Sequence, residues 1–133
     1  MNDLLAWLVA AIKAEPSLAE FKDRVFPDAA PENAKNPCLV YQLYGDESEA
    51  TLDPGPLKDG SYAYQIRIYA GTRIRANALR EIFRIKFQGM TPLSIGGGWR
   101  IEGSAWGNLA ETYDEKLRDY GALGVLEVHL TGE

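Results

Sequence analysis

The stretch that decides the fold is Tyr62-Ala63-Tyr64-Gln65-Ile66-Arg67-Ile68-Tyr69-Ala70, which has the clearest two-residue period in the chain. Every second residue from Tyr62 onward is apolar or aromatic, which predicts a β-strand with one buried face. The segment that follows predicts a helix over residues 73–88. Thr72 can cap its start and Gly89 can end it. We expect this helix to bury one apolar stripe, which consists of Ile74, Ala78, Ile82 and Ile85.

Upstream of this strand, a helix is expected over residues 3–14, with Pro16 as its stop. A short second helix is expected over 17–25, because Ser17 and Glu20 form a capping box. Residues 26–37 hold three prolines and predict a loop. The remaining strands are expected at 38–44, at 93–104 with an interruption at Gly96-Gly97-Gly98, and at 125–131.

The order of these elements is α(α)ββαββ, and hairpin connections dominate it. We therefore expect the α+β class, with a single mostly antiparallel four-stranded sheet and two main helices packed on one face. A chain of 133 residues fits a single domain, residues 1–133. Residues 45–60 form an acidic Pro/Gly loop in this scheme. A loop of that length in a compact domain is often either functional or disordered.

Charge is unevenly distributed along the chain, whose formal net charge is −5. Residues 67–100 hold seven bases and one acid, whereas residues 1–66 hold 11 acids and five bases, and residues 101–133 hold seven acids and two bases. One interpretation is a fold that neutralises itself. The other is a basic face on one copy that meets an acidic face on another. The net acidity argues against a sequence-specific nucleic-acid partner and against an anionic membrane surface. The longest apolar run, residues 4–12, is too short for a membrane-spanning helix.

The sequence offers no catalytic, cofactor or metal motif, and we expect a protein that is not an enzyme and binds none of these groups. A phosphate-binding loop and a Gly-x-Ser-x-Gly elbow are both missing. The single histidine, His129, is expected on an exposed strand position without a catalytic partner. The single cysteine, Cys38, begins a strand after Pro37 and is expected to be a buried thiol.

One polar constellation stands out on the helix expected at 73–88. Its members recur at spacings of four, three and four residues and form one stripe: Arg73, Asn77, Arg80 and Arg84. Arginines in line can bind carboxylates or phosphates. The stripe is therefore a plain solvated face, a docking surface for an acidic protein partner, or a nucleic-acid contact. The corresponding acidic candidates lie in the 45–60 loop and are Asp46, Glu47, Glu49 and Asp53.

Several strings, taken in order, resemble the tail completion or tail terminator proteins of long-tailed bacteriophages and prophages. The strings are Ala14-Glu15-Pro16-Ser17-Leu18, Val25-Phe26-Pro27, Asn36-Pro37-Cys38-Leu39-Val40-Tyr41-Gln42, Tyr64-Gln65-Ile66-Arg67-Ile68-Tyr69-Ala70, Glu111-Thr112-Tyr113-Asp114 and Gly124-Val125-Leu126-Glu127-Val128-His129-Leu130. They span nearly the whole chain. The segment 93–110, which includes Gly96-Gly97-Gly98 and Trp106, has no counterpart in the family pattern.

The resemblance implies a structural virion protein that forms a ring, typically of six copies, at the head-proximal end of a tail tube. Such a ring ends tail growth and presents a surface for the head connector. The implied partners are further copies of the chain, the tail tube protein and the head–tail connector protein, with no membrane. The implied location is the virion tail, after assembly in the host bacterial cytoplasm. Another neck or head–tail joining protein, or an unrelated cytoplasmic binding domain or small enzyme, remains open as an alternative.

Overall fold

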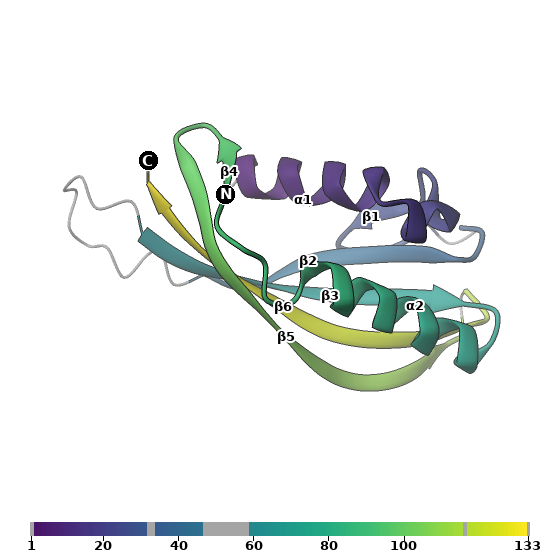
Figure 1. Cartoon of the computed structure of the whole chain (residues 1–133). Helices are drawn as coiled ribbons and strands as arrows, with labels where there is room; N and C mark the ends of the chain where they lie inside the picture. Colours follow the sequence, from purple (N-terminus) through teal and green to yellow (C-terminus); the bar gives the residue numbers. More distant parts are fainter. Residues whose placement is uncertain (1, 32–33, 47–58, 116, 133) are drawn as a thin grey trace.

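The computed structural model describes residues 2–31, 34–46, 59–115 and 117–132. Within them the chain forms α1 (Asn2–Ala14), a 3-10 helix η1 (Pro16–Phe21), and α2 (Arg73–Phe87). The strands are β1 (Val25–Pro27), β2 (Cys38–Asp46), β3 (Asp59–Ala70), β4 (Leu93–Gly96), β5 (Trp99–Asp114) and β6 (Asp119–Gly132). Figure 1 shows the helices together over one side of a long, twisted sheet.

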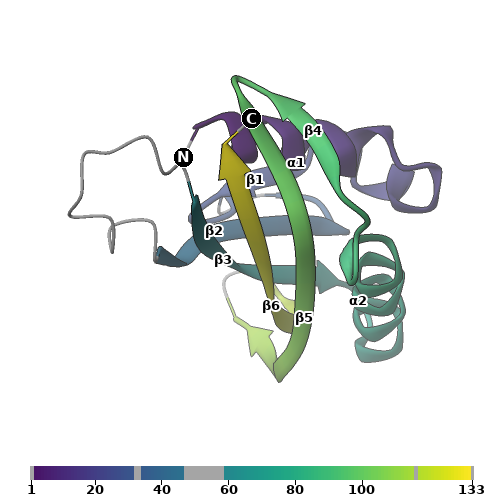
Figure 2. The ribbon, with the colours of Figure 1, turned by 60° about the vertical axis from the view of Figure 1, so that its left-hand side comes forward.

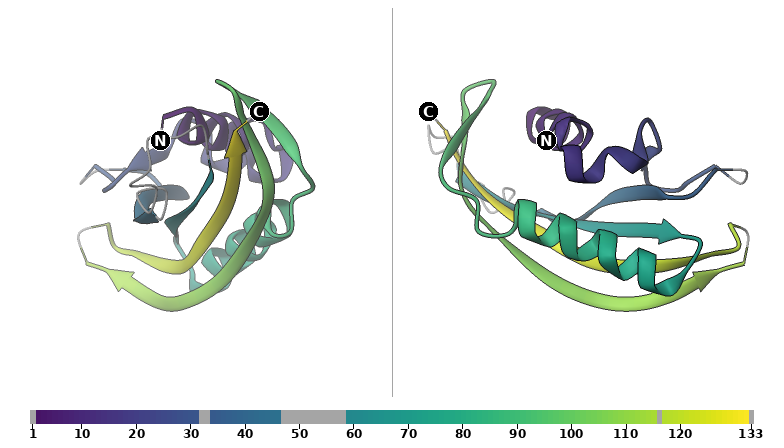
Figure 3. Two further views of the ribbon diagram at one scale, coloured as in Figure 1. Left: turned by 90° about the vertical axis from the view of Figure 1, so that its left-hand side faces the viewer. Right: turned by 45° about the vertical axis from the view of Figure 1, so that its right-hand side comes forward.

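The expectation of a four-stranded, mostly antiparallel sheet is wrong. The described strands form one six-stranded mixed sheet in the order β1-β2-β3-β6-β5-β4, in which β1 pairs with β2 in parallel. The sheet curls strongly along β5 and β6 (Figures 2 and 3). One whole strand, β1, and the second half of β5 escaped prediction for physical reasons. β1 has only three residues, and the second half of β5 is exposed, so burial imposes no alternation on its sequence.

Other boundaries also changed. The short helix expected at 17–25 is a 3-10 helix that ends at Phe21, after which the chain enters β1. The interrupted strand expected at 93–104 is a hairpin of β4 and β5, whose turn contains three glycines at positive φ, residues 96–98. The strand expected at 125–131 is the second half of β6, and its alternation is confirmed by buried Leu126, Val128 and Leu130.

One continuous core lies between the helices and the sheet. Leu4, Leu8 and Ile12 of α1 are fully buried, as are the core-facing residues of β3, Ile66 and Ile68. The alternation that opened the sequence analysis is therefore confirmed. A second, smaller cluster lies on the opposite face of the sheet, where Cys38, Val40 and Tyr69 pack against partly buried Phe26, Ala30 and Leu117.

Trp106, in the segment without a family counterpart, has a packing role. The centroid of its aromatic ring lies 5.2 Å from the centroid of the phenyl ring of Phe83 on α2. It also covers Gly124, the residue two positions before Leu126 on the neighbouring strand β6. A Cβ atom at Gly124 would lie 2.0 Å from Trp106 Cζ2, so the indole occupies the space of the missing side chain.

The expected buried stripe of α2 is wrong. The helix buries Ala76, Leu79, Phe83 and Phe87 instead. Ile74 is 84% exposed and Ile85 is 68% exposed. α2 carries two apolar stripes at helical spacing, and the sheet accepts the one with the larger side chains. Two phenylalanines and a leucine remove more apolar area from water than isoleucines and an alanine do.

Candidate assembly surface

The polar stripe on α2 exists, but it lies against the chain's own sheet. Arg73 Nε is 2.5 Å from Glu111 Oε2, and Asn77 Nδ2 donates to Glu111 Oε1 at 2.7 Å. The side-chain oxygen of Asn77, Oδ1, in turn accepts from Arg80 Nη2 at 3.0 Å. The Asn77 amide and the Arg73 guanidinium hold the pKa of Glu111 below its usual range. Sequence reasoning missed Glu111 as the partner of the stripe.

Arg80 forms hydrogen bonds with backbone carbonyl groups at a β-bulge in the sheet. Between Asn108 and Glu111 the register of β5 shifts against β6, and no β5 residue pairs with Leu123. Arg80 Nη1 donates to the Leu123 carbonyl at 2.9 Å and approaches the Leu109 carbonyl at 3.5 Å. A side chain from α2 thus supplies the donor that the β-bulge removes from the ladder. This role depends on tertiary structure and has no signal in the sequence.

Most bases of the basic segment, residues 67–100, form ion pairs with acids of the same chain. Four bases between residues 73 and 100 pair with acids outside that span: Arg73 with Glu111, Arg75 with Glu20, Lys86 with Glu15, and Arg100 with Glu102. Arg84 pairs with Glu81 on the same helix turn, and its Nε lies 2.9 Å from Glu81 Oε2. These pairs show the self-neutralising fold that the charge distribution allowed.

Five of the eight candidate interface residues lie among the residues that the structure describes. Arg73, Asn77 and Arg80 form one network, while Arg84 lies at its edge and also donates to Gln88 Oε1 at 3.0 Å. Arg73 still exposes 70% of its side chain. Asp46 is the last residue of β2. The other acidic candidates, Glu47, Glu49 and Asp53, lie outside the described residues.

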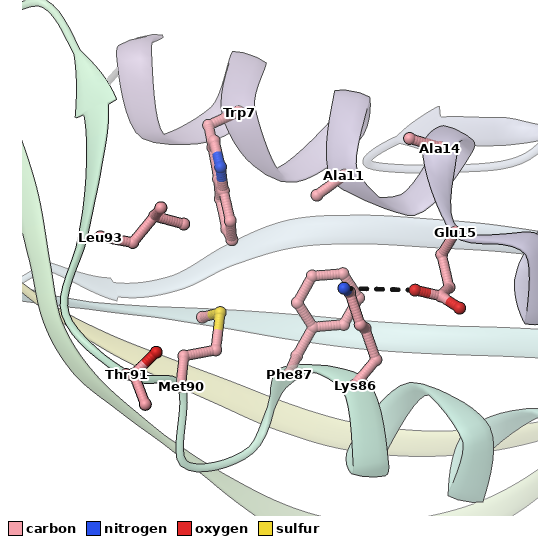
Figure 4. A pocket seen from close by; sticks show the side chains of 9 residues that line it. All are labelled: Trp7, Ala11, Ala14, Glu15, Lys86, Phe87, Met90, Thr91 and Leu93. Carbon is pink, nitrogen blue, oxygen red and sulfur yellow. Dashed lines mark ion pairs between the residues drawn. The ribbon is translucent and has the colours of Figure 1, made fainter.

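The described surface is hollowed in several places, and both apolar and polar side chains line these hollows. The groove in Figure 4 has a volume of about 470 Å³ and lies between α1, the end of α2 and β4. Trp7 reaches into it from α1 above Met90 (Figure 4). The two charged groups at its border, Lys86 and Glu15, pair at 3.2 Å. The Ser17 hydroxyl and Lys86 lower the pKa of Glu15.

The single cysteine and the single histidine lie on two different strands, β2 and β6. Burial raises the pKa of the Cys38 thiol to about 11, so the thiol stays protonated near neutral pH. His129 is exposed on β6, with Nδ1 3.2 Å from the Ser61 hydroxyl. Among the described residues no three His, Cys, Asp or Glu side chains gather at a spacing that could hold a metal ion. The described helices include none with the length and hydropathy of a membrane-spanning segment.

Among the described residues, large apolar side chains are exposed in four places, one of which is Leu93 on β4. On α2 these are Ile74 and Ile85; on the end of β2 they are Leu43 and Tyr44. At the β5–β6 end of the sheet they are Leu109, Tyr113 and Tyr120, and the two tyrosine rings contact each other with centroids 5.0 Å apart. Exposed apolar groups that gather on the surface of a small domain mark sites of protein contact.

Comparison with known proteins finds a similar fold among solved structures. Neither a protein-family model nor a curated protein matches the chain. Among solved structures, it is similar to a chain described as "Virion of native gene transfer agent (GTA) particle". The TM-score is 0.65, and the match covers 97% of this chain and 95% of the other. The sequences are 18% identical, so the likeness is one of fold.

Proposed function

We propose that this protein is a structural component of a phage-like virion, without catalytic activity. The observation that supports the proposal most is the fold, which matches a chain of a gene transfer agent particle over nearly its full length. The exposed apolar groups on α2, on β2 and at the β5–β6 end of the sheet add the surface that an assembling subunit needs.

Within that class, the proposed role is that of a tail terminator. A ring of copies, typically six, would cap the head-proximal end of a tail tube, end its growth and present a surface to the head–tail connector. This finer role rests on the ordered strings described in the sequence analysis. The proposed location is the virion tail, with assembly in the cytoplasm of the bacterial host.

In this proposal, the arginine stripe of one copy contacts the acidic segment of the next copy. Arg73 and Arg84 have exposed guanidinium groups at the border of α2, although both have a carboxylate partner in the same chain. Contact with an acidic group of the next copy, such as Asp46, Glu47, Glu49 or Asp53, would extend these pairs. Exposed ion pairs contribute about 0–1 kcal/mol each, so such contacts would orient copies more than hold them.

The test is whether the protein assembles into rings and whether it stops the growth of a tail tube. Native mass spectrometry and negative-stain imaging over a range of protein and salt concentrations should show closed rings. Added to polymerising tail tube protein, the protein should bind one tube end and stop further growth. Rings that join the head connector but leave tube growth unchanged would instead indicate a head–tail joining protein. Failure both to form rings and to bind virion parts would refute the proposal.

A further inference from the structure

Most of one side of the long strand β5 has no partner strand among the described residues. β4 pairs only with its first residues, Trp99 to Ile101, and the Gly89 amide then donates to the Ser104 carbonyl at 3.0 Å. From residue 105 to 114, no backbone hydrogen bond among the described residues joins β5 to any strand but β6. Figure 2 shows β5 continuing far beyond β4 along the border of the sheet.

The opposite border of the sheet has a second open stretch. β1 covers β2 only at residues 39–41, and the Asp28 amide ends this cover by donating to the Tyr41 carbonyl at 2.9 Å. The remainder of β2, residues 42–46, pairs with β3 on one side and with no other described strand. The two open stretches therefore lie on opposite borders of one sheet.

The direction of the free backbone groups follows from neighbouring contacts. Strand residues alternate in the side to which their N–H and C=O groups point. The Ser104 carbonyl points away from β6, so Trp106 and Asn108 also present their groups to the open side. On β2, the Leu39 amide and the Tyr41 carbonyl point toward β1, so Leu43 presents its groups to the open border.

Each of these borders contains one feature that protects free strand edges, a β-bulge between Asn108 and Glu111 on β5 and between Leu43 and Gly45 on β2, but each lacks the others. Natural proteins blunt such edges with lysine, proline or very short strands. β1 is short and ends in Pro27, and β4 is short and follows Pro92. Neither 105–114 nor 42–46 contains a lysine or proline, and each exposes large apolar side chains, among them Tyr44 and Leu109.

We infer that the open edge of β5 in one copy pairs with the open edge of β2 in the next copy, so that the sheet continues from subunit to subunit. One copy carries both borders, so a second copy of the same chain satisfies both with a single kind of contact. A contact between two different patches is heterologous and closes into a ring when the rotation permits. The inference deepens the proposed function and rests on its ring.

The surface beside the β5 edge fits this arrangement. α2 borders β5 through Arg73, Asn77 and Arg80. A strand added at β5 therefore brings the neighbouring subunit alongside α2, where Ile74 and Ile85 are exposed. Backbone pairing sets the register of the two copies, and the apolar groups on both sides add buried area.

Proline substitution tests the inference, because proline removes one N–H and is tolerated at an edge whose N–H faces solvent. Asn108→Pro and Leu43→Pro should each retain the monomer fold by circular dichroism and lose rings in native mass spectrometry. The matched controls Asn108→Ala and Leu43→Ala remove the same side chains, including the Asn108 oxygen that accepts from Trp106 Nε1, but keep the N–H. Both controls should still form rings.

A mixing experiment then tests the direction of the contact. Asn108→Pro retains its β2 edge and Leu43→Pro retains its β5 edge, so an equimolar mixture should form a one-to-one dimer and no ring. In the wild-type ring, hydrogen exchange at the Trp106, Asn108 and Leu43 amides should slow at least tenfold relative to dilute monomer. That measurement needs no variant and holds even if a proline variant fails to fold.

The outcomes separate this inference from the proposed function. Wild-type rings that persist in both proline variants, or that leave the three amides unprotected, overturn the edge pairing and leave a ring-forming virion protein in place. A wild-type protein that stays monomeric at every concentration overturns edge pairing as a self-contact. The tube-growth assay still decides the terminator role in that case.

Discussion

Replacing Arg80 by methionine should destabilise the protein far more than the same change at Arg84, four residues along the same helix. Methionine keeps the length and helix propensity of the side chain and removes its donors. Arg80 Nη1 is 2.9 Å from the Leu123 carbonyl, which the β5 bulge leaves without a ladder partner, and Nη2 is 3.0 Å from Asn77 Oδ1. Arg84 instead pairs with Glu81 at an exposed position.

The magnitude follows from these contacts. A hydrogen bond from a charged group contributes about 1.5–3 kcal/mol, and leaving the part-buried Leu123 carbonyl unpaired adds to the loss. The 3.5 Å approach to Leu109 adds little. We expect Arg80→Met to lower the free energy of unfolding by about 2–3 kcal/mol. Arg84→Met should lower it by less than about 1 kcal/mol, the usual range of an exposed pair.

Urea unfolding of dilute protein, followed by circular dichroism and tryptophan fluorescence, measures the difference. The urea slope should be unchanged, so that the shift in midpoint reports stability alone. For a chain of this length the melting temperature of Arg80→Met should fall by roughly 6–12 °C. Equal losses for the two variants, or a loss below about 0.5 kcal/mol for Arg80→Met, would refute the assignment of Arg80 as the donor that closes the bulge.

Three further outcomes are expected. Gly124→Ala should cost about 1–3 kcal/mol, because its new Cβ meets the indole that covers this position, whereas Gly107→Ala has open space and should cost little; thermal melting compares them. Leu79→Asp should abolish the folded circular dichroism spectrum while Ile85→Asp retains it, and an unfolded Ile85→Asp would contradict the exposed second stripe. The pKa of Cys38 is raised to about 11, so the folded state keeps a proton that the unfolded thiol loses above about pH 8.5. Stability should therefore fall as pH rises from there toward 11, and Cys38→Ala should lose part of that dependence in urea titrations at several pH values.

Local patterns in the sequence predicted the features that depend on residues close together in the chain. Alternation from Tyr62 to Ala70 predicted a half-buried strand, and the caps Thr72 and Gly89 bounded α2 to within two residues. The buried Cys38 and the exposed His129 were also predicted. Each of these results depends on side-chain period or backbone preference, which the sequence displays directly.

Only the tertiary structure decided what depends on residues far apart in the chain. The periodicity of α2 fits two apolar stripes, and the shape of the curled sheet selects the one with Leu79 and Phe83. From the sequence alone, the arginine stripe could bind either a partner or the chain itself. In the fold, β5 places Glu111 next to Arg73, from which it is separated by 38 positions in the sequence. The second half of β5 has no alternation, since one of its borders is free and its faces are exposed. Sequence period records burial, so it cannot show a strand edge or a charge whose partner arrives through the fold.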